Sequence, residues 1–168
     1  MPRPDLSRVP DYYHRYIAYV QPNDLAKAMQ QQQEVISFLK SLPAEKWNYA
    51  YAEGKWTIKE MVQHMIDTER IFAYRALTFA RKDATALPGF EENDYAAASD
   101  ANRRSPASLI RDLQVVQESS ALLFESFSEA QLEAEGVANG KSVYVRGIGF
   151  ILVGHVLHHM SILKERYL

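Results

Sequence analysis

The segment Val145-RGIGFILVGHVLHHMSILKER-Tyr167 determines the fold class, because it is long, apolar and helical in its periodicity. Selected positions recur at intervals of three and four, the spacing that brings side chains onto one face of an α-helix. They are Ile148, Leu152, His155, His159, Ile162 and Arg166. The segment therefore predicts one long helix over 145–167, with two histidines on the same stripe as its apolar residues.

Three further segments have the same periodicity and recognisable ends. A helix is predicted from Asn23 or Asp24 to residue 42, where Pro43 stops it. Thr57-Ile-Lys-Glu60 fits a capping box, which predicts the start of a helix that continues to about residue 81. Ser105-Pro106 fits an N-cap followed by proline at the first helical position, and this helix is predicted to end near residue 127.

The four predicted helices belong to one domain. Residues 1–22 contain four prolines and predict an N-terminal arm with one short helix, while Asn139-Gly140 marks a turn before the last helix. We find no stretch of alternating apolar and polar residues that would compete as a strand. The sequence therefore predicts an all-α protein, an up-and-down four-helix bundle, as a single domain over residues 1–168.

Composition excludes several classes of function. Lys and Arg total 19 against 21 Asp and Glu, so the chain lacks the basic surface that nucleic-acid binding requires. The start resembles no secretory signal, and the most apolar run, 148–157, is too short to span a bilayer, so we expect a cytoplasmic protein without a membrane partner. Because there are no cysteines, any metal must be bound by nitrogen or oxygen ligands.

Histidines are the candidate ligands. His155 and His159 lie four residues apart, so both imidazoles project from one face of the helix and could bind one ion. Such pairs also occur on helices that bind no metal. His64 lies on a predicted inward face of the helix over 57–81, where it could be a third ligand or a core histidine that is hydrogen-bonded to a polar neighbour.

The motifs together resemble the DinB/YfiT-like superfamily, and in particular its DinB-family members. The resemblance covers nearly the whole chain from the first long helix. It rests on Gly54-KWTIK-Glu60, His64-MIDTERIFAYR-Ala76, Leu87-PGF-Glu91 and Gly154-HVLH-His159. It implies a four-helix bundle that binds a divalent transition metal, Ni²⁺ or Zn²⁺, through His64, His155 and His159. His158 is a neighbour that the pattern does not assign to the metal.

The resemblance implies a metal-dependent hydrolase or an S-transferase that uses a low-molecular-weight thiol, and the residues do not select between them. Three nitrogen ligands leave a coordination position open for a small-molecule substrate. The alternative is a non-catalytic metal-binding protein of stress response or assembly. His158 is a weak candidate for proton transfer, no residue is identified as a general base, and a homodimer is expected.

Some further expectations depend on tertiary structure. If the helices over 57–81 and 145–167 start at the same end of the bundle, the three histidines can share one level. The pocket rim would then be formed by aromatic residues, which could equally cap the bundle core: Trp47, Tyr49, Tyr51, Trp56 and Tyr144. Glu69 and Asp67 are expected to be solvated or structural, and the acidic loop 90–95 to be a packing or dimer element. Gly147, Gly149 and Gly154 indicate close helix contact, within the bundle or across a dimer.

Overall fold

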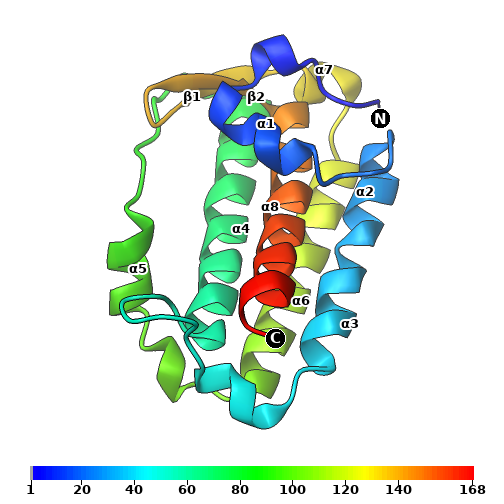
Figure 1. Cartoon of the computed structure of the whole chain (residues 1–168). Coiled ribbons are helices and arrows are strands. Elements are labelled where there is room, and N and C mark those ends of the chain that lie inside the picture. The colour runs from blue at the N-terminus through cyan, green and yellow to red at the C-terminus, as the bar shows by residue number, and fades with distance from the viewer. Residues whose placement is uncertain (1) are drawn as a thin grey trace.

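The computed structural model describes residues 2–168 and confirms the all-α four-helix bundle (Figure 1). The first bundle helix is divided into α2 (Leu25–Gln31) and α3 (Gln33–Lys40), and the others are α4 (Ile58–Ala80), α6 (Pro106–Glu125) and α8 (Val145–Arg166). The short helical segments are η1 (Leu6–Arg8), α1 (Asp11–Ile17), η2 (Ala44–Asn48), α5 (Glu92–Ala98), η3 (Ala101–Arg103) and α7 (Glu129–Leu132). Strands β1 (Glu135–Ala138) and β2 (Lys141–Tyr144) complete the chain.

The predicted helix starts are confirmed at the level of their hydrogen bonds. The Thr57 hydroxyl accepts from the Glu60 amide at 3.2 Å, and the Glu60 carboxylate accepts from the Thr57 amide at 2.7 Å, which is the reciprocal capping box. Ser105 caps α6 through the amide of Ser108, and Asp24 caps α2 through the amide of Lys27. These caps satisfy amides that have no partner inside the helix.

The expectation that α4 and α8 start at the same end of the bundle is wrong. The Tyr167 hydroxyl, at the end of α8, donates to the Trp56 carbonyl just before α4 begins, at 2.7 Å. The Lys59 amine, in the first turn of α4, donates to the Asn102 carbonyl just before α6 begins. Helices α4 and α8 are therefore antiparallel, and α4 and α6 run in the same direction, so the four-helix bundle does not have the predicted up-and-down order (Figure 1).

A long connection makes this direction pattern feasible. From the end of α4 the chain returns along the length of the bundle through α5 and η3 before α6 begins (Figure 1). Helix α5 packs on α4 during this return. The connection over residues 81–105 therefore covers one side of α4, and the predicted packing role of the acidic loop is confirmed for this part of it.

A β-hairpin, which we did not predict, lies between α7 and α8. Strands β1 and β2 pair antiparallel, with Glu135 opposite Tyr144 and Ala138 opposite Lys141. Asn139 and Gly140 both have positive φ, 51° and 69°, as a two-residue hairpin turn requires. The strands have four residues each and little alternation between apolar and polar side chains, so only the Asn-Gly turn was recognisable from sequence.

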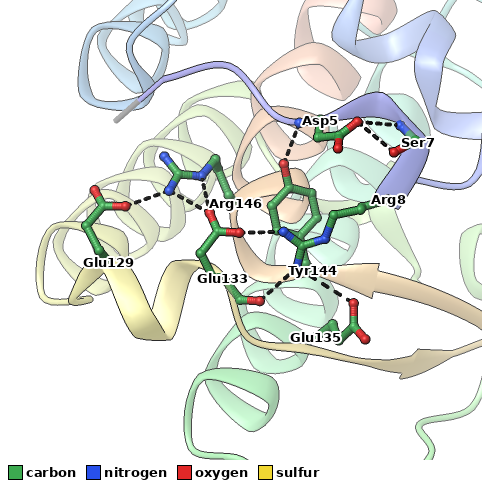
Figure 2. A network of polar contacts seen from close by, with 8 residues as sticks. All are labelled: Asp5, Ser7, Arg8, Glu129, Glu133, Glu135, Tyr144 and Arg146. Carbon is green, nitrogen blue, oxygen red and sulfur yellow. Dashed lines mark hydrogen bonds and ion pairs between the residues drawn. The ribbon is translucent and has the colours of Figure 1, made fainter.

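The N-terminal arm packs across α8 through α1. Gly154 of α8 makes this contact possible, because a Cβ at this position would lie 2.1 Å from the Tyr16 carbonyl oxygen. Arg3 donates to the carbonyls of Val20 and Ile17, and the Tyr144 hydroxyl accepts from the Asp5 amide at 2.6 Å (Figure 2). The close contact that the helix glycines indicated is thus, at Gly154, a contact within the chain.

Helix α8 is the central element of the core. By length and composition it could cross a membrane, but 78% of its most apolar stretch is buried inside the bundle. Its neighbours α1, α2, α4 and α7 cover it. We interpret its apolar character as that of a central core helix.

Candidate metal centre

The three histidines that the sequence selected lie together between α4 and α8. The Nε2 atom of His155 is 3.0 Å from Nε2 of His64 and 3.1 Å from Nε2 of His159. One ligand atom from each of the three lies within 4.8 Å of the others. The antiparallel arrangement produces this meeting, since the second turn of α4 and the middle of α8 lie at the same level of the bundle.

All three imidazoles are buried, and burial favours their neutral form. Burial lowers the pKa of His64 to about 4. Burial, followed by repulsion from the neighbouring histidines, lowers the pKa values of His155 and His159 well below the usual range. Neutral imidazoles are the form that binds a divalent ion, so the cluster is ready for a metal without first losing protons.

Aromatic side chains pack on two of the three imidazoles and hold them in place. Trp56 packs on His64 with 4.9 Å between ring centroids, and Tyr16 of α1 packs edge-on to His155 at 5.4 Å. His158 lies outside the three-histidine group and packs on Tyr16 and Tyr19. Packing on both sides restricts the imidazole rotamers, which orients the nitrogens toward their common centre.

A pocket of about 940 Å³ reaches the cluster from one side of the bundle. His64 and His155 form part of its wall, and the other walls come from α1, α4, the loop that precedes α5 and the hairpin tip. Side chains of α1, α4 and α8 in its lining include Tyr13, Tyr16, His64, Thr68, Phe72, Arg75 and His155. The acidic loop, which we expected to be a packing or dimer element, also lines the pocket through Phe90, Glu91 and Glu92.

The predicted aromatic rim is wrong, and the direction of α8 explains the error. None of its five residues lines the pocket. Tyr144 is at the far end of α8, bonded to the arm, while Tyr49 and Tyr51 pack on Tyr167 near the C-terminus. Of the five, Trp56 is the one in ring contact with a histidine of the cluster.

Glu69 is also not where sequence placed it. Its side chain is 1% exposed in the core, and neither carboxyl oxygen has a well-formed hydrogen bond within residues 2–168. Burial raises its pKa to about 7, with the nearby Ser120 hydroxyl opposing part of the rise. Asp67, by contrast, is structural as expected, since it accepts from Gln63 and lies 3.9 Å from Arg70.

Two polar residues of the pocket wall were missed by sequence reasoning. Thr68 lies one turn after His64, and its buried hydroxyl oxygen has no partner in the described part of the chain. Arg75 lies two turns further along the same face. The i, i+4, i+8 and i+11 spacing from His64 was readable in the sequence, but nothing local distinguished this face of α4 from its others.

The cluster fits a divalent metal by the chemistry of its donors. Three neutral nitrogens converge in a buried position, and no carboxylate competes for them in the group. Imidazole nitrogen suits Zn²⁺, Ni²⁺ and related ions, and a site with three protein ligands would leave a coordination position open. The same three residues lie in the motifs that carried the family resemblance.

Comparison with known proteins agrees with this geometry. A family model described as the DinB superfamily matches residues 28–163. A protein of Geobacillus thermodenitrificans named "Putative metal-dependent hydrolase" is 27% identical over 130 residues, covering 73% of this chain and 72% of its own length. An Oceanobacillus iheyensis protein with the same description is 29% identical over 127 residues, covering 74% and 72%.

Solved structures share the fold at low identity. YfiT from Bacillus subtilis, described as a probable metal-dependent hydrolase with an unusual four-helix bundle topology, aligns with a TM-score of 0.72 and 15% identity over 97% of this chain and 90% of its own. The mycothiol-dependent maleylpyruvate isomerase aligns with a TM-score of 0.65 and 14% identity, over 82% and 60%. At these identities the likeness shows the fold.

Proposed function

The chain belongs to the DinB superfamily, and we propose that it is a metal-dependent enzyme whose divalent ion is bound by His64, His155 and His159. The observation that carries the proposal is the convergence of three Nε2 atoms, 3.0 and 3.1 Å apart, with His64 and His155 in the wall of a large pocket. Without an ion, three buried imidazoles offer each other few good hydrogen bonds. The Nδ1 atom of His159 also lacks a partner within residues 2–168.

The pocket supports an enzyme over a purely structural metal protein. A structural site is normally closed by four protein ligands, whereas three ligands and an open approach are typical of catalytic sites. The bound ion would supply Lewis acidity and lower the pKa of a water or thiol that reaches it. Ni²⁺ and Zn²⁺ are the ions that we propose, because the donors are all imidazole nitrogen.

The chain's own residues supply positioning. Tyr16 and Trp56 hold the imidazoles in orientation, and α1 with the loop before α5 shields the cluster from bulk water. The Thr68 hydroxyl, buried without a partner one turn from His64, can donate a hydrogen bond to an oxygen or sulfur atom in the pocket. The described residues place no carboxylate beside the cluster as a general base.

Two reaction classes remain in the proposal. Hydrolysis is supported by the descriptions of the sequence relatives, and transfer involving a low-molecular-weight thiol by the name of the structurally similar isomerase. A screen of the metal-loaded protein separates them. One assay offers ester and amide substrates, and the other offers an electrophile with bacillithiol, mycothiol or glutathione. Turnover in one assay selects that reaction class, and no turnover in either assay favours the non-catalytic alternative.

Metal analysis tests the site itself. Protein purified without an affinity tag is compared with His155→Ala, and with His158→Ala as a control of the same residue type on the same helix. We expect about one divalent ion per chain in the native protein and the control, and at least a tenfold loss in His155→Ala. Equal metal content in all three would refute the ligand assignment.

Assembly and location are further parts of the proposal. We propose a cytoplasmic homodimer, supported by Val115 and Leu122, which are exposed and seven residues apart on one face of α6. Light scattering of the purified chain should give twice 19.2 kDa. A mass of one chain at micromolar concentration would contradict the dimer and leave the metal site unaffected.

A further inference from the structure

We propose that Arg75 binds an anionic group of the substrate, a carboxylate or another oxyanion, at the end of the pocket away from the histidines. This deepens the proposed function by naming a substrate class for the same pocket. The proposal rests on a buried guanidinium that faces the pocket and has no counterion.

The first observation is the state of Arg75. The side chain is 4% exposed, and no carboxylate within residues 2–168 forms an ion pair with it. Its protein contacts are a hydrogen bond from Nη2 to the Pro88 carbonyl at 2.9 Å, the Phe72 ring at 4.7 Å from Cζ, and the neighbouring Tyr13 hydroxyl. A guanidinium has five N–H donors, so donors remain for a ligand.

Arg146 shows what this protein does with a buried arginine that has only a structural role. It has the same 4% exposure, yet it bonds Glu129 at 2.6 Å and Glu133 at 2.7 Å (Figure 2). Removing a charge from water costs free energy unless a partner compensates for it. The protein provides this compensation at Arg146 and omits it at Arg75, which faces the pocket.

The second observation is the arrangement along α4. His64, Thr68, Phe72 and Arg75 all line the same pocket at helical spacing. The Cα atoms of His64 and Arg75 are separated by eleven residues, or roughly 16 Å at the rise of an α-helix. Phe72 and Tyr13, with ring centroids 5.8 Å apart, form an aromatic wall between the two ends.

These positions define the ligand's chemistry. A ligand that spans the pocket would place its anionic group on the planar fork of Arg75, which matches a carboxylate or phosphate. Its middle part would contact Phe72, and its reacting end would lie near Thr68 and the histidines. The carboxylates at the pocket mouth, Asp11, Glu91, Glu92 and Glu135, are exposed and do not neutralise this cation.

Calorimetric titration with matched probes tests the inference. Octanoate and octanamide have the same chain length and differ in charge, and octyl phosphate tests whether another oxyanion is accepted. We expect octanoate to bind at least tenfold more tightly than octanamide. Arg75→Gln should abolish this preference, Arg75→Lys should retain part of it, and Arg70→Gln, at an exposed arginine of the same helix, should leave it unchanged.

A carboxylate can also bind a metal directly, so the titrations are repeated in His155→Ala. If His155→Ala still prefers octanoate, the preference comes from the Arg75 guanidinium and not from a metal ion. If Arg75→Gln does not fold, the inference is tested by the octanoate preference of the native chain and by the weakening of this preference in Arg75→Lys. Equal binding of octanoate and octanamide, absence of octanoate binding, or a preference that survives in Arg75→Gln would each overturn the inference.

Metal content of the same samples separates this inference from the proposed function. Octanoate preference in a chain that binds no metal would refute the metal enzyme and leave the Arg75 site standing. Full metal content without any preference for octanoate would refute the Arg75 site and leave the metal site standing.

Discussion

At the scale of single residues, several buried polar groups of α4 lack the contacts that would compensate for their burial, so stability does not explain them. Thr68, Glu69 and Arg75 are each buried on α4. Thr68 and Glu69 have no well-formed side-chain hydrogen bond within residues 2–168, and Arg75 has hydrogen bonds but no carboxylate partner there. Thr68 and Arg75 face the pocket, whereas Glu69 faces the core near Ser120. Burying such groups costs folding free energy, so their positions on one helix help to identify functional residues.

Glu69 predicts a pH dependence of stability. Its pKa is raised from 4.5 to about 7 by burial, so between these values the folded chain keeps a proton that the unfolded chain has lost. Because the folded state binds more protons in this window, the free energy of unfolding falls as pH rises through it. Glu69→Gln should remove this fall and be more stable at pH 8 by on the order of 3 kcal/mol.

Urea unfolding at pH 5 and pH 8 measures this difference. Glu118→Gln, at an exposed glutamate of α6, is the control and should differ little from the native chain at either pH. The prediction fails if the stability gap between Glu69→Gln and the native chain is the same at both pH values.

At the scale of secondary-structure elements, the crossing of α1 over α8 connects fold to site. Tyr16 of α1 packs on His155 and lines the pocket, and its carbonyl lies against Gly154. The absence of a side chain at Gly154 therefore sets how closely the arm approaches the histidines. A helix-interior glycine costs about 1 kcal/mol of intrinsic helix stability, and this contact is what it allows.

Gly154→Ala should destabilise the protein, although alanine is the better helix former. Its Cβ would lie 2.1 Å from backbone that cannot rotate away, so α1 must move, at a cost of about 1–3 kcal/mol. Gly149→Ala is the matched control, since its nearest neighbours are the side chains of Leu25 and Phe124. Thermal unfolding should show the larger loss for Gly154→Ala, and a rise in its Tm would contradict the account.

At the scale of the whole molecule, the site is assembled from segments distant in sequence. The N-terminal arm, α4, the return connection and the hairpin all line one pocket. The arm precedes the region matched by the family model, which begins at residue 28, yet it buries Val9, Tyr16, Ile17 and Val20 against the bundle. We infer that the arm is part of the domain and part of the site.

Deleting residues 2–22 should therefore lower stability by several kcal/mol, since each large buried side chain contributes about 1.5–3 kcal/mol. Urea unfolding of residues 23–168 against the full chain measures the loss. Tyr12→Ala removes an arm side chain that is 55% exposed and should have little effect. An unchanged urea midpoint in the truncated chain would show that the arm is not part of the folding unit.

The sequence by itself determined the four helices and three of their caps, because periodicity and capping are local properties of the chain. The same spacing paired His155 with His159, and the family resemblance joined His64 to them. Only the tertiary structure decided that α4 and α8 are antiparallel, since the connection over 81–105 is long enough to end at either end of the bundle. That direction places Tyr144, at the start of α8, and the connection over 43–56, which meets the end of α8, at opposite ends of the bundle, so they cannot form one rim. The burial of Glu69 likewise depends on which helix covers that face of α4, and helical periodicity alone does not show which helix packs there.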